Sequence, residues 1–260
     1  MKKVAFTIVL NGMPFLKQQY EIIPKVFDEW IIVEGYALPV KDTSWCRNID
    51  MNKFTINGLS NDGTTEFLDS IACDKIKIIR KPNGQYWNGK TEMCNAAIAG
   101  LSDTILMEFD VDEIWKESVL DDILCYAEQN SDIIDGMRFK CNYYVGPNMV
   151  TVGNNCYGNN YGEWSRLWVI RMPTTFKTHE PPVLDRVEQR IVDRDTTMNW
   201  GWVFDHYAYV IEEQLKFKED YYGYRGAVSL WKNLQKQSTF PCKLKPFLPW
   251  VDDKATVIKI

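Results

Sequence analysis

Four apolar runs that alternate with helix-like segments are the feature that most constrains the fold. The runs are KVAFTIVL at 3–10, EWIIVEGY at 29–36, KIKIIRK at 75–81 and TILMEFD at 104–110. Such continuous, β-branched-rich runs are typical of strands that helices cover on both faces. The intervening segments predict helices at 15–27, 64–72 and 90–100. This alternation predicts an α/β fold with a mostly parallel sheet through about residue 115.

Breaker residues and a change of pattern organise the rest of the chain. Pro24 is expected to close the first helix, Gly100 to end the third, and Ser118 to cap a fourth at 119–130. Antiparallel strands are then expected at 136–146, 149–155 and 165–172, with a last strand at 204–210. Helices at 211–223 and 226–235 and a Pro-rich tail complete the prediction. Residues 37–63 lack periodicity and predict a long loop beside the strand ends that orders over a bound ligand.

An acidic group follows the fourth apolar run. Asp110, Asp112 and Glu113 stand where a parallel sheet of this kind binds ligands, beyond the carboxyl ends of its strands. Side chains two residues apart in an extended segment point to the same side, so the two aspartates can face one ligand. Their hard oxygens suit Mg²⁺ or Mn²⁺ together with substrate phosphates. The alternative is a solvated acidic turn, because short D-x-D sequences also arise by chance.

Composition limits the functional classes. The net charge of -5 and the pI near 5.2 disfavour a broad nucleic-acid-binding surface. Seven cysteines, an odd count without a CxxC pair, suit a reducing compartment. The sequence has no apolar run of 18 residues, so it predicts no transmembrane segment. We therefore expect a cytoplasmic protein. The sequence does not fix its oligomeric state.

The motifs resemble those of a known family. The segment NGMPFL at 11–16, the run ending in VEGY and the stretch ILMEFDVDE at 105–113 resemble the GT-A fold glycosyltransferases, in particular family 2-like and β-1,4-mannosyl-glycoprotein N-acetylglucosaminyltransferase-like enzymes. The resemblance implies one domain, with a nucleotide-sugar-binding half at 1–116, an acceptor-side half at 117–210 and C-terminal helices and tail at 211–260. It also implies a UDP-sugar donor and Mn²⁺ or Mg²⁺.

The same resemblance implies roles for individual residues. It places Asp110 near the ribose or the metal and Asp112 on the metal. It assigns Glu34 to the base or ribose and His206 to a third metal contact. Donor contacts are further implied for these residues: Asn11, Lys90 and Asn95. Lys90 could instead be a solvated helix start and His206 a packed core residue, in which case His179 is the reserve ligand.

The catalytic base is left open by the residues alone. An inverting transferase, as the resembling branch is, needs a carboxylate that accepts the proton of the acceptor hydroxyl. The candidates in the acceptor-side half are Glu163, Glu180 and Asp185. The acceptor is a saccharide or glycoconjugate, with a hydroxylated nucleic-acid base as the less favoured possibility.

Two other functional classes are alternatives. A lectin-like or inactive transferase-fold module would bind sugars on exposed indole rings, for which the candidates are Trp45, Trp87, Trp164 and Trp168. A haloacid dehalogenase-like phosphatase also carries D-x-D after a strand. Its motif usually stands on the first strand, whereas this one stands on the fourth.

Overall fold

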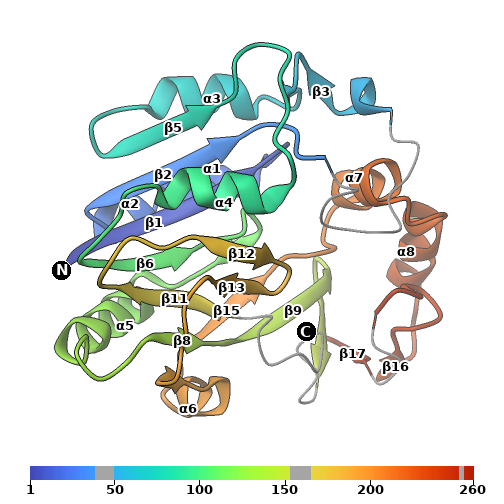
Figure 1. Cartoon of the computed structure of the whole chain (residues 1–260). Helices are drawn as coiled ribbons and strands as arrows, with labels where there is room; N and C mark the ends of the chain where they lie inside the picture. Colours follow the sequence, from blue (N-terminus) through green and yellow to red (C-terminus); the bar gives the residue numbers. More distant parts are fainter. Residues whose placement is uncertain (39–49, 153–164, 252–254) are drawn as a thin grey trace.

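A seven-stranded mixed sheet forms the centre of the protein in the computed structural model, which describes residues 1–38, 50–152, 165–251 and 255–260 (Figure 1). In spatial order its strands are β14 (Ile191–Val192), β8 (Gly136–Arg138), β11 (Ser165–Ile170), β6 (Thr104–Glu108), β1 (Lys2–Val9), β2 (Glu29–Glu34) and β5 (Ile76–Arg80). Strands β6, β1, β2 and β5 pair in parallel, whereas β11 is antiparallel to both of its neighbours. The predicted α/β fold with a mostly parallel sheet is confirmed.

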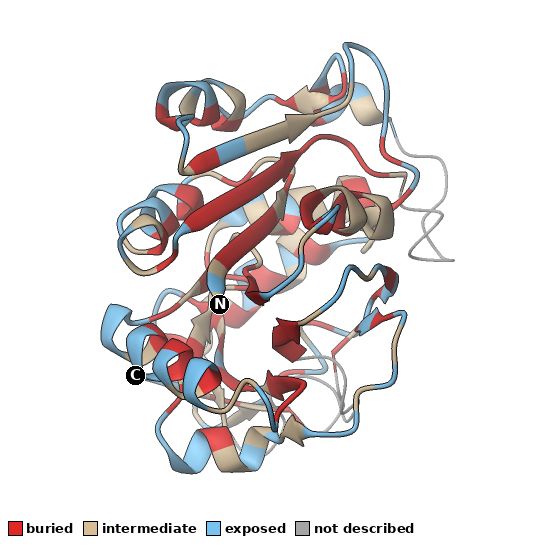
Figure 2. Ribbon diagram, turned by 60° about the vertical axis from the view of Figure 1, so that its left-hand side comes forward, coloured by how far each residue is buried: buried red, intermediate tan, exposed pale blue. Residues whose placement is uncertain are grey.

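Helices cover both faces of this sheet because its central strands are apolar on both sides. Along β1, Val4 and Phe6 pack with α4 (Lys90–Ile98), whereas Ala5 and Val9 belong to the core on the opposite face. That opposite core also contains apolar residues of these helices: α1 (Phe15–Tyr20), α2 (Ile23–Val26), α3 (Thr64–Ile71) and α5 (Glu117–Gln129). Figure 2 shows the central strands buried and the outer helix faces exposed.

A second, six-stranded sheet is built from the later part of the chain. Its order is β16 (Cys242–Lys243), β17 (Thr256–Lys259), β10 (Met149–Val152), β9 (Lys140–Gly146), β15 (Val203–His206) and β7 (Glu113–Ile114). Helix α6 (Arg194–Asn199) precedes β15, and α7 (Glu212–Tyr222) and α8 (Ala227–Gln235) follow it, so the two predicted C-terminal helices are present. The tail adds β16 and β17 to the sheet, which the sequence analysis did not predict.

Three local predictions are corrected. The helix expected at 15–27 is two helices, and Pro24 lies in the first turn of α2, where its missing N–H is no loss. Lys116, not Ser118, precedes α5 as its cap residue. Of the loop expected at 37–63, the described part holds the 3₁₀ turn η2 (Met51–Lys53) and the hairpin β3 (Thr55–Ile56) and β4 (Leu59–Ser60). Residues 39–49 lie outside the described residues.

The fold also contains the short hairpin β12 (Phe176–His179) and β13 (Pro182–Leu184), which packs against α4. Its strand β12 ends in a buried histidine beside the end of β6. Among the described residues, none of the helices combines the length and the apolar character that crossing a bilayer requires.

Candidate active site

A cavity of about 960 Å³ lies beyond the carboxyl ends of β1 and β6. It is lined by the end of β1, by the acidic turn after β6, by the β12–β13 hairpin, by the end of β15 and by α7. This is the edge at which a parallel sheet places its ligands. Residues from distant parts of the sequence therefore meet at one concave site.

The acidic turn joins the two sheets. Strand β6 ends at Glu108, the Glu113 N–H donates to the Asp110 carbonyl over 2.9 Å, and β7 then pairs with β15 in the register Glu113 to His206. Gln19 of α1 stabilises the turn, because its side-chain amide donates to the Asp110 carbonyl over 2.6 Å. The sequence analysis missed this buried glutamine. It fixes the backbone of the turn, so the two aspartates are positioned by the core.

This register brings Asp112 to His206, as the resemblance implied. The Asp112 Oδ1 and His206 Nε2 atoms are 3.4 Å apart, and the Tyr207 N–H donates to the Asp112 carbonyl over 2.8 Å. The His206 ring also lies 5.0 Å from the Tyr143 ring, so it is packed as well as polar. Burial alone would lower the pKa of His206, but the Asp112 carboxylate outweighs it and raises the pKa.

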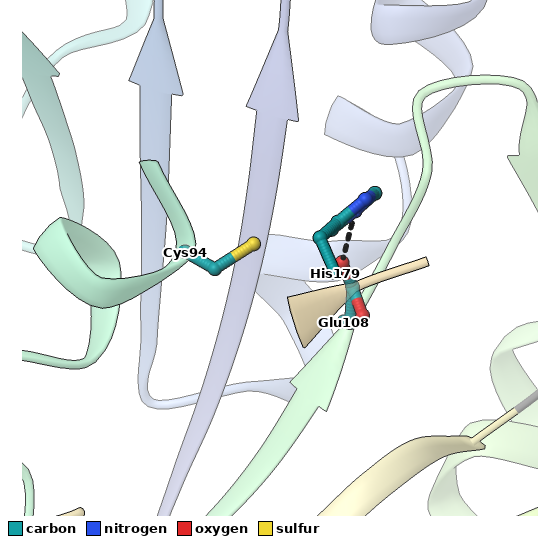
Figure 3. Close-up of side chains that lie close together, drawn as sticks. All are labelled: Cys94, Glu108 and His179. Atoms are coloured by element: carbon teal, nitrogen blue, oxygen red, sulfur yellow. Dashed lines mark ion pairs between the residues drawn. The ribbon is translucent and has the colours of Figure 1, made fainter. Parts of the chain in front are cut away.

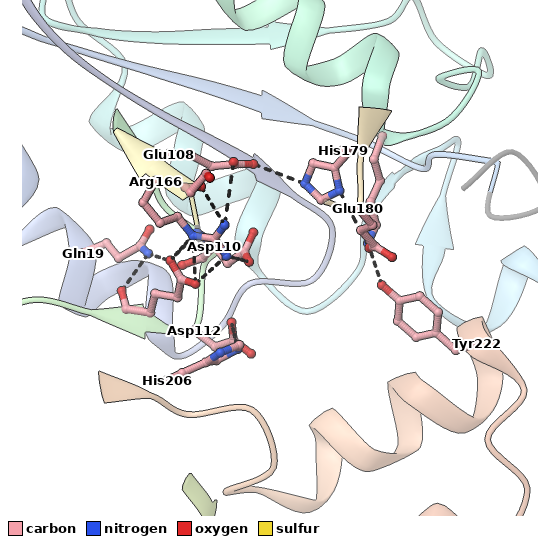
Figure 4. A network of polar contacts seen from close by, with 12 residues as sticks. Gln19, Glu108, Asp110, Asp112, Arg166, His179, Glu180, His206 and Tyr222 are labelled. Carbon is pink, nitrogen blue, oxygen red and sulfur yellow. Dashed lines mark hydrogen bonds and ion pairs between the residues drawn. The ribbon is translucent and has the colours of Figure 1, made fainter. Parts of the chain in front are cut away.

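The buried Arg166 lies among the other carboxylates of the site, those of Glu108, Asp110 and Glu113 (Figure 4). From β11 its guanidinium donates to both oxygens of Glu113 over 2.7 to 3.1 Å and to Asp110 Oδ2 over 2.8 Å. Glu108 Oε2 lies 4.0 Å from its Nη1 atom. Arg166 was not among the predicted site residues. Its signal was a charge inside the apolar run SRLWVI, because charged residues are almost never fully buried unless they are paired.

Negative charge is in excess around this guanidinium. Three carboxylates surround one arginine, and burial raises the pKa of Glu113 to about 7 even though Arg166 contacts both of its oxygens. Asp110 adds to that rise by its like charge. A divalent cation beside Asp110 and Asp112 would relieve the repulsion. The oxygen and imidazole donors of Asp110, Asp112 and His206 suit Mg²⁺ or Mn²⁺ in charge and in chemistry, although among the described residues the ligand atoms of these three do not all lie within 4.8 Å of one another.

A second chain of polar contacts leads away from Glu108. His179 Nε2 lies 3.2 Å from Glu108 Oε1, and His179 Nδ1 lies 3.7 Å from Glu180 Oε1. Burial alone would lower the pKa of His179, but the two carboxylates raise it to about 9. The Lys90 ammonium pairs with Glu180 and donates to the Tyr222 hydroxyl over 2.9 Å. Together, Lys90 and His179 outweigh burial and hold the pKa of Glu180 well below its usual range.

Cys94, Glu108 and His179 form a compact buried cluster (Figure 3). In the described part of the chain it is the one group of three His, Cys, Asp or Glu ligand atoms that lie within 4.8 Å of one another. Thiolate, carboxylate and imidazole together would suit Zn²⁺. However, the raised pKa of His179 means that the imidazole carries a proton at neutral pH. That proton already supplies the positive charge beside Glu108.

Other predicted residues lie elsewhere. Glu34 is fully buried, pairs with Arg80 over 2.7 Å and does not line the cavity. The Asn95 amide exchanges two hydrogen bonds with the Phe176 backbone, over 3.1 and 2.6 Å, and also lies outside the cavity. Asp185 pairs with Lys177 at the surface. Donor roles for Glu34 and Asn95 and a base role for Asp185 remain predictions.

Asn11 lines the cavity after the end of β1, and Gly12 follows it in the chain. The Asn11 side chain lines the cavity and donates to the Phe54 carbonyl over 2.8 Å. A Cβ atom on Gly12 would lie 2.8 Å from a methyl of Val111, so a glycine lets the end of β1 approach the acidic turn.

The remaining predictions concern Glu163 and the tryptophans. Glu163, Trp45 and Trp164 lie outside the described residues. Trp87 and Trp168 are 4% and 1% exposed, so neither offers a free ring face to a sugar. Glu180 is thus the one proposed base that the described residues place in the cavity.

The fold resembles solved structures of S. aureus TarS. TarS 1–349 in complex with UDP is 12% identical, with 65% of this chain and 47% of that chain covered and a TM-score of 0.44. TarS 1–349 in complex with UDP-GlcNAc is 13% identical, with 65% and 45% covered and a TM-score of 0.41. A TarS structure that covers 92% of this chain and 44% of that chain is 10% identical, with a TM-score of 0.44. This chain therefore spans less than half the length of those chains, and the likeness concerns the fold alone. No protein-family model and no curated protein matches the sequence.

Proposed function

We propose that this protein is a divalent-cation-dependent glycosyltransferase, which moves a sugar from a UDP-sugar to a hydroxyl of a saccharide or glycoconjugate. One observation carries the proposal: a single cavity at the strand ends combines the Asp112–His206 pair and Asp110 with two lysines, Lys90 and Lys218. A carboxylate–imidazole set suits a divalent cation, and lysines suit phosphate. A nucleoside diphosphate bound through a cation needs both.

The residues of the acidic turn and His206 would have distinct roles in binding the cation. Asp110, Asp112 and His206 would hold Mn²⁺ or Mg²⁺, which when bound neutralises the charge of the departing diphosphate. Arg166 keeps Asp110 in position through the 2.8 Å contact, and the His206 imidazole must lose its proton for the cation to bind. The cation and the proton therefore compete for this histidine.

Glu180 is the candidate base for an inverting transfer. It lines the cavity and is ionised, so it can accept the proton of an acceptor hydroxyl. A general base works best when its pKa is near the working pH, and Lys90 holds the pKa of Glu180 far below that. A phosphate that draws Lys90 away would raise the pKa of Glu180. Binding of the donor would then activate the base.

The test compares Asp112→Asn with the wild type, and Asp122→Asn, an exposed residue of α5, serves as a matched control. Transfer from a panel of nucleotide sugars onto oligosaccharide acceptors is followed by mass spectrometry with Mn²⁺ and with excess chelator. We expect Asp112→Asn and the chelator each to abolish transfer, because a neutral amide does not offset a cation's charge, while the control stays active. Full turnover of Asp112→Asn would contradict the metal role.

A binding measurement separates the proposal from the lectin-like alternative. Thermal unfolding of the wild type is recorded with UDP and Mn²⁺, with UDP alone and with free sugars. Stabilisation that needs both UDP and Mn²⁺ supports the transferase, since a ligand that binds only the folded state raises its stability. Stabilisation by free sugars alone would support a carbohydrate-binding module instead.

A further inference from the structure

Lys218 differs from the other lysines of the cavity. Four lysines line it among the described residues: Lys53, Lys90, Lys216 and Lys218. Lys53 pairs with Asp220 over 3.0 Å, Lys90 pairs with Glu180, and the Lys216 side chain is exposed to water. Lys218 is half-buried, and no described carboxylate lies within ion-pair distance of its Nζ atom.

Aromatic rings hold the Lys218 ammonium in place. Its Nζ atom lies 5.1 Å from the centre of the Tyr209 ring and 5.6 Å from that of Tyr222. The Lys90 ammonium lies 5.3 Å from the centre of the same Tyr222 ring, so Tyr222 contacts both lysines. Ring faces attract a cation, but they carry no net charge. The positive charge of Lys218 is therefore positioned without being neutralised.

The ammonium also remains charged in this setting. Burial and the nearby Lys90 charge would lower the pKa of Lys218, but the electrostatic influence of Tyr209, Tyr222 and the Asp112 carboxylate outweighs both and raises the pKa. An ammonium has three N–H donors, and a half-buried cation without a counter-ion is costly unless an anion joins it. The cavity, which α7 and the acidic turn both line, offers room for such an anion.

We propose that Lys218, together with Lys90 across the Tyr222 ring, forms the subsite that binds the diphosphate group of the nucleoside-diphosphate donor. The inference rests on the proposed function, because that function supplies the ligand. The inference adds to the proposed function that α7 binds the diphosphate, although α7 lies outside the motifs of the first 116 residues. Asp112 lines the same cavity and accepts a hydrogen bond over 3.4 Å from Gln214, one turn before Lys218 on α7, so a cation there and Lys218 would share one diphosphate.

The test measures binding without metal, so that the acidic turn does not contribute through a cation. Isothermal titration in chelator and low salt determines Kd for pyrophosphate and for UDP, with Lys218→Met and with Lys216→Met as a control of equal charge on the same helix. We expect Lys218→Met to weaken binding of both ligands about 10-fold or more and Lys216→Met to weaken it less than about 2-fold, because of these two lysines Lys218 is the one that lies over ring faces. Lys218→Arg should restore most of the affinity.

Several outcomes would overturn the subsite. These are equal losses in the Lys218 and Lys216 variants, no loss in either, or a wild type that binds neither pyrophosphate nor UDP. Circular dichroism checks folding, and Lys218→Gln replaces Lys218→Met if the latter does not fold. The two proposals fail separately. Lys218-dependent pyrophosphate binding without any sugar transfer would overturn the function alone, and unchanged donor binding by the Lys218 variants in an active transferase would overturn the subsite alone.

Discussion

Replacing Arg166 by methionine tests whether the buried guanidinium holds the acidic turn together. The substitution removes the contacts to both Glu113 oxygens, at 2.7 to 3.1 Å, and the 2.8 Å contact to Asp110. Methionine keeps most of the apolar volume of the side chain, so the main loss is the charge. The perturbation therefore isolates the ionic role of Arg166.

The size of the effect follows from the burial of the partners. Arg166 and Glu113 are both buried, and removing one partner of a buried pair typically costs about 3–5 kcal/mol, because the other charge is left uncompensated. At about 2–4 °C per kcal/mol for a chain of this size, the melting temperature should fall by roughly 6–20 °C. The surface pair of Lys177 with Asp185 provides a control, since exposed pairs contribute little.

The loss should also depend on pH in a defined direction. The pKa of Glu113 in the folded protein, about 7, lies above its ordinary value of 4.5, so ionising this group destabilises the fold as the pH rises from about 4.5 through 7. Without Arg166 that pKa rises further. The deficit of Arg166→Met relative to wild type should therefore be smaller at pH 5 than at pH 8.

Urea unfolding of wild type, Arg166→Met, Glu113→Gln and the double variant at pH 5 and pH 8 measures these free energies. The double variant should recover much of the loss at pH 8, because no ionised Glu113 then remains without its partner. A deficit below about 1 kcal/mol, or one that is equal at both pH values, would refute the reasoning.

Three further outcomes follow from the network. His206→Ala should raise the Mn²⁺ concentration needed for activity by about 10-fold, a loss of about 1.4 kcal/mol of metal-binding free energy. In the wild type, the Mn²⁺ concentration needed should rise as the pH falls through the raised pKa of His206. An unchanged metal titration would leave His206 a packing residue. His179 has a pKa of about 9 in the folded protein, above its ordinary 6.5, so the stability from its ion pairs is fully present below pH 6.5 and is lost as the pH rises through 9. His179→Gln should therefore reduce the loss of unfolding free energy, measured in urea, between pH 6.5 and 9. An unaltered loss over that range would contradict the ion pairs of His179. Glu180→Gln should lower the transfer rate about 10²- to 10⁴-fold with donor affinity little changed, and a rate within about 2-fold of wild type would remove Glu180 as the base.

Hydrophobic periodicity alone determined the first half of the fold. The runs around β1, β2, β5 and β6 contain enough β-branched and apolar residues to specify strands without any partner, although only Ile76 of the edge strand β5 is buried, and the helices between them follow from local pattern. Parallel pairing then follows from the intervening helices. The same argument placed Asp110 and Asp112 at the carboxyl end of β6, because a strand's end is a local property.

Two of the three corrected predictions concern helix ends, which are local features. Pro24 is compatible with a helix start as well as with a helix end, and only the packing of α2 distinguishes the two. Ser118 is a favourable cap, yet α5 begins at Glu117, two residues before the predicted start, which no propensity resolves.

The site itself was decided by tertiary structure. The sequence could nominate His206, but the 3.4 Å approach to Asp112 depends on the register of β7 with β15, which are far apart in the chain. Arg166 and Lys218 were not nominated because a lone charge has no periodicity. Their importance comes from what surrounds them: buried carboxylates for Arg166, and ring faces without a counter-ion for Lys218. Periodicity is a property of neighbouring residues, whereas the energy of a charge depends on burial and on the distance to other charges, which exist only after the chain has folded.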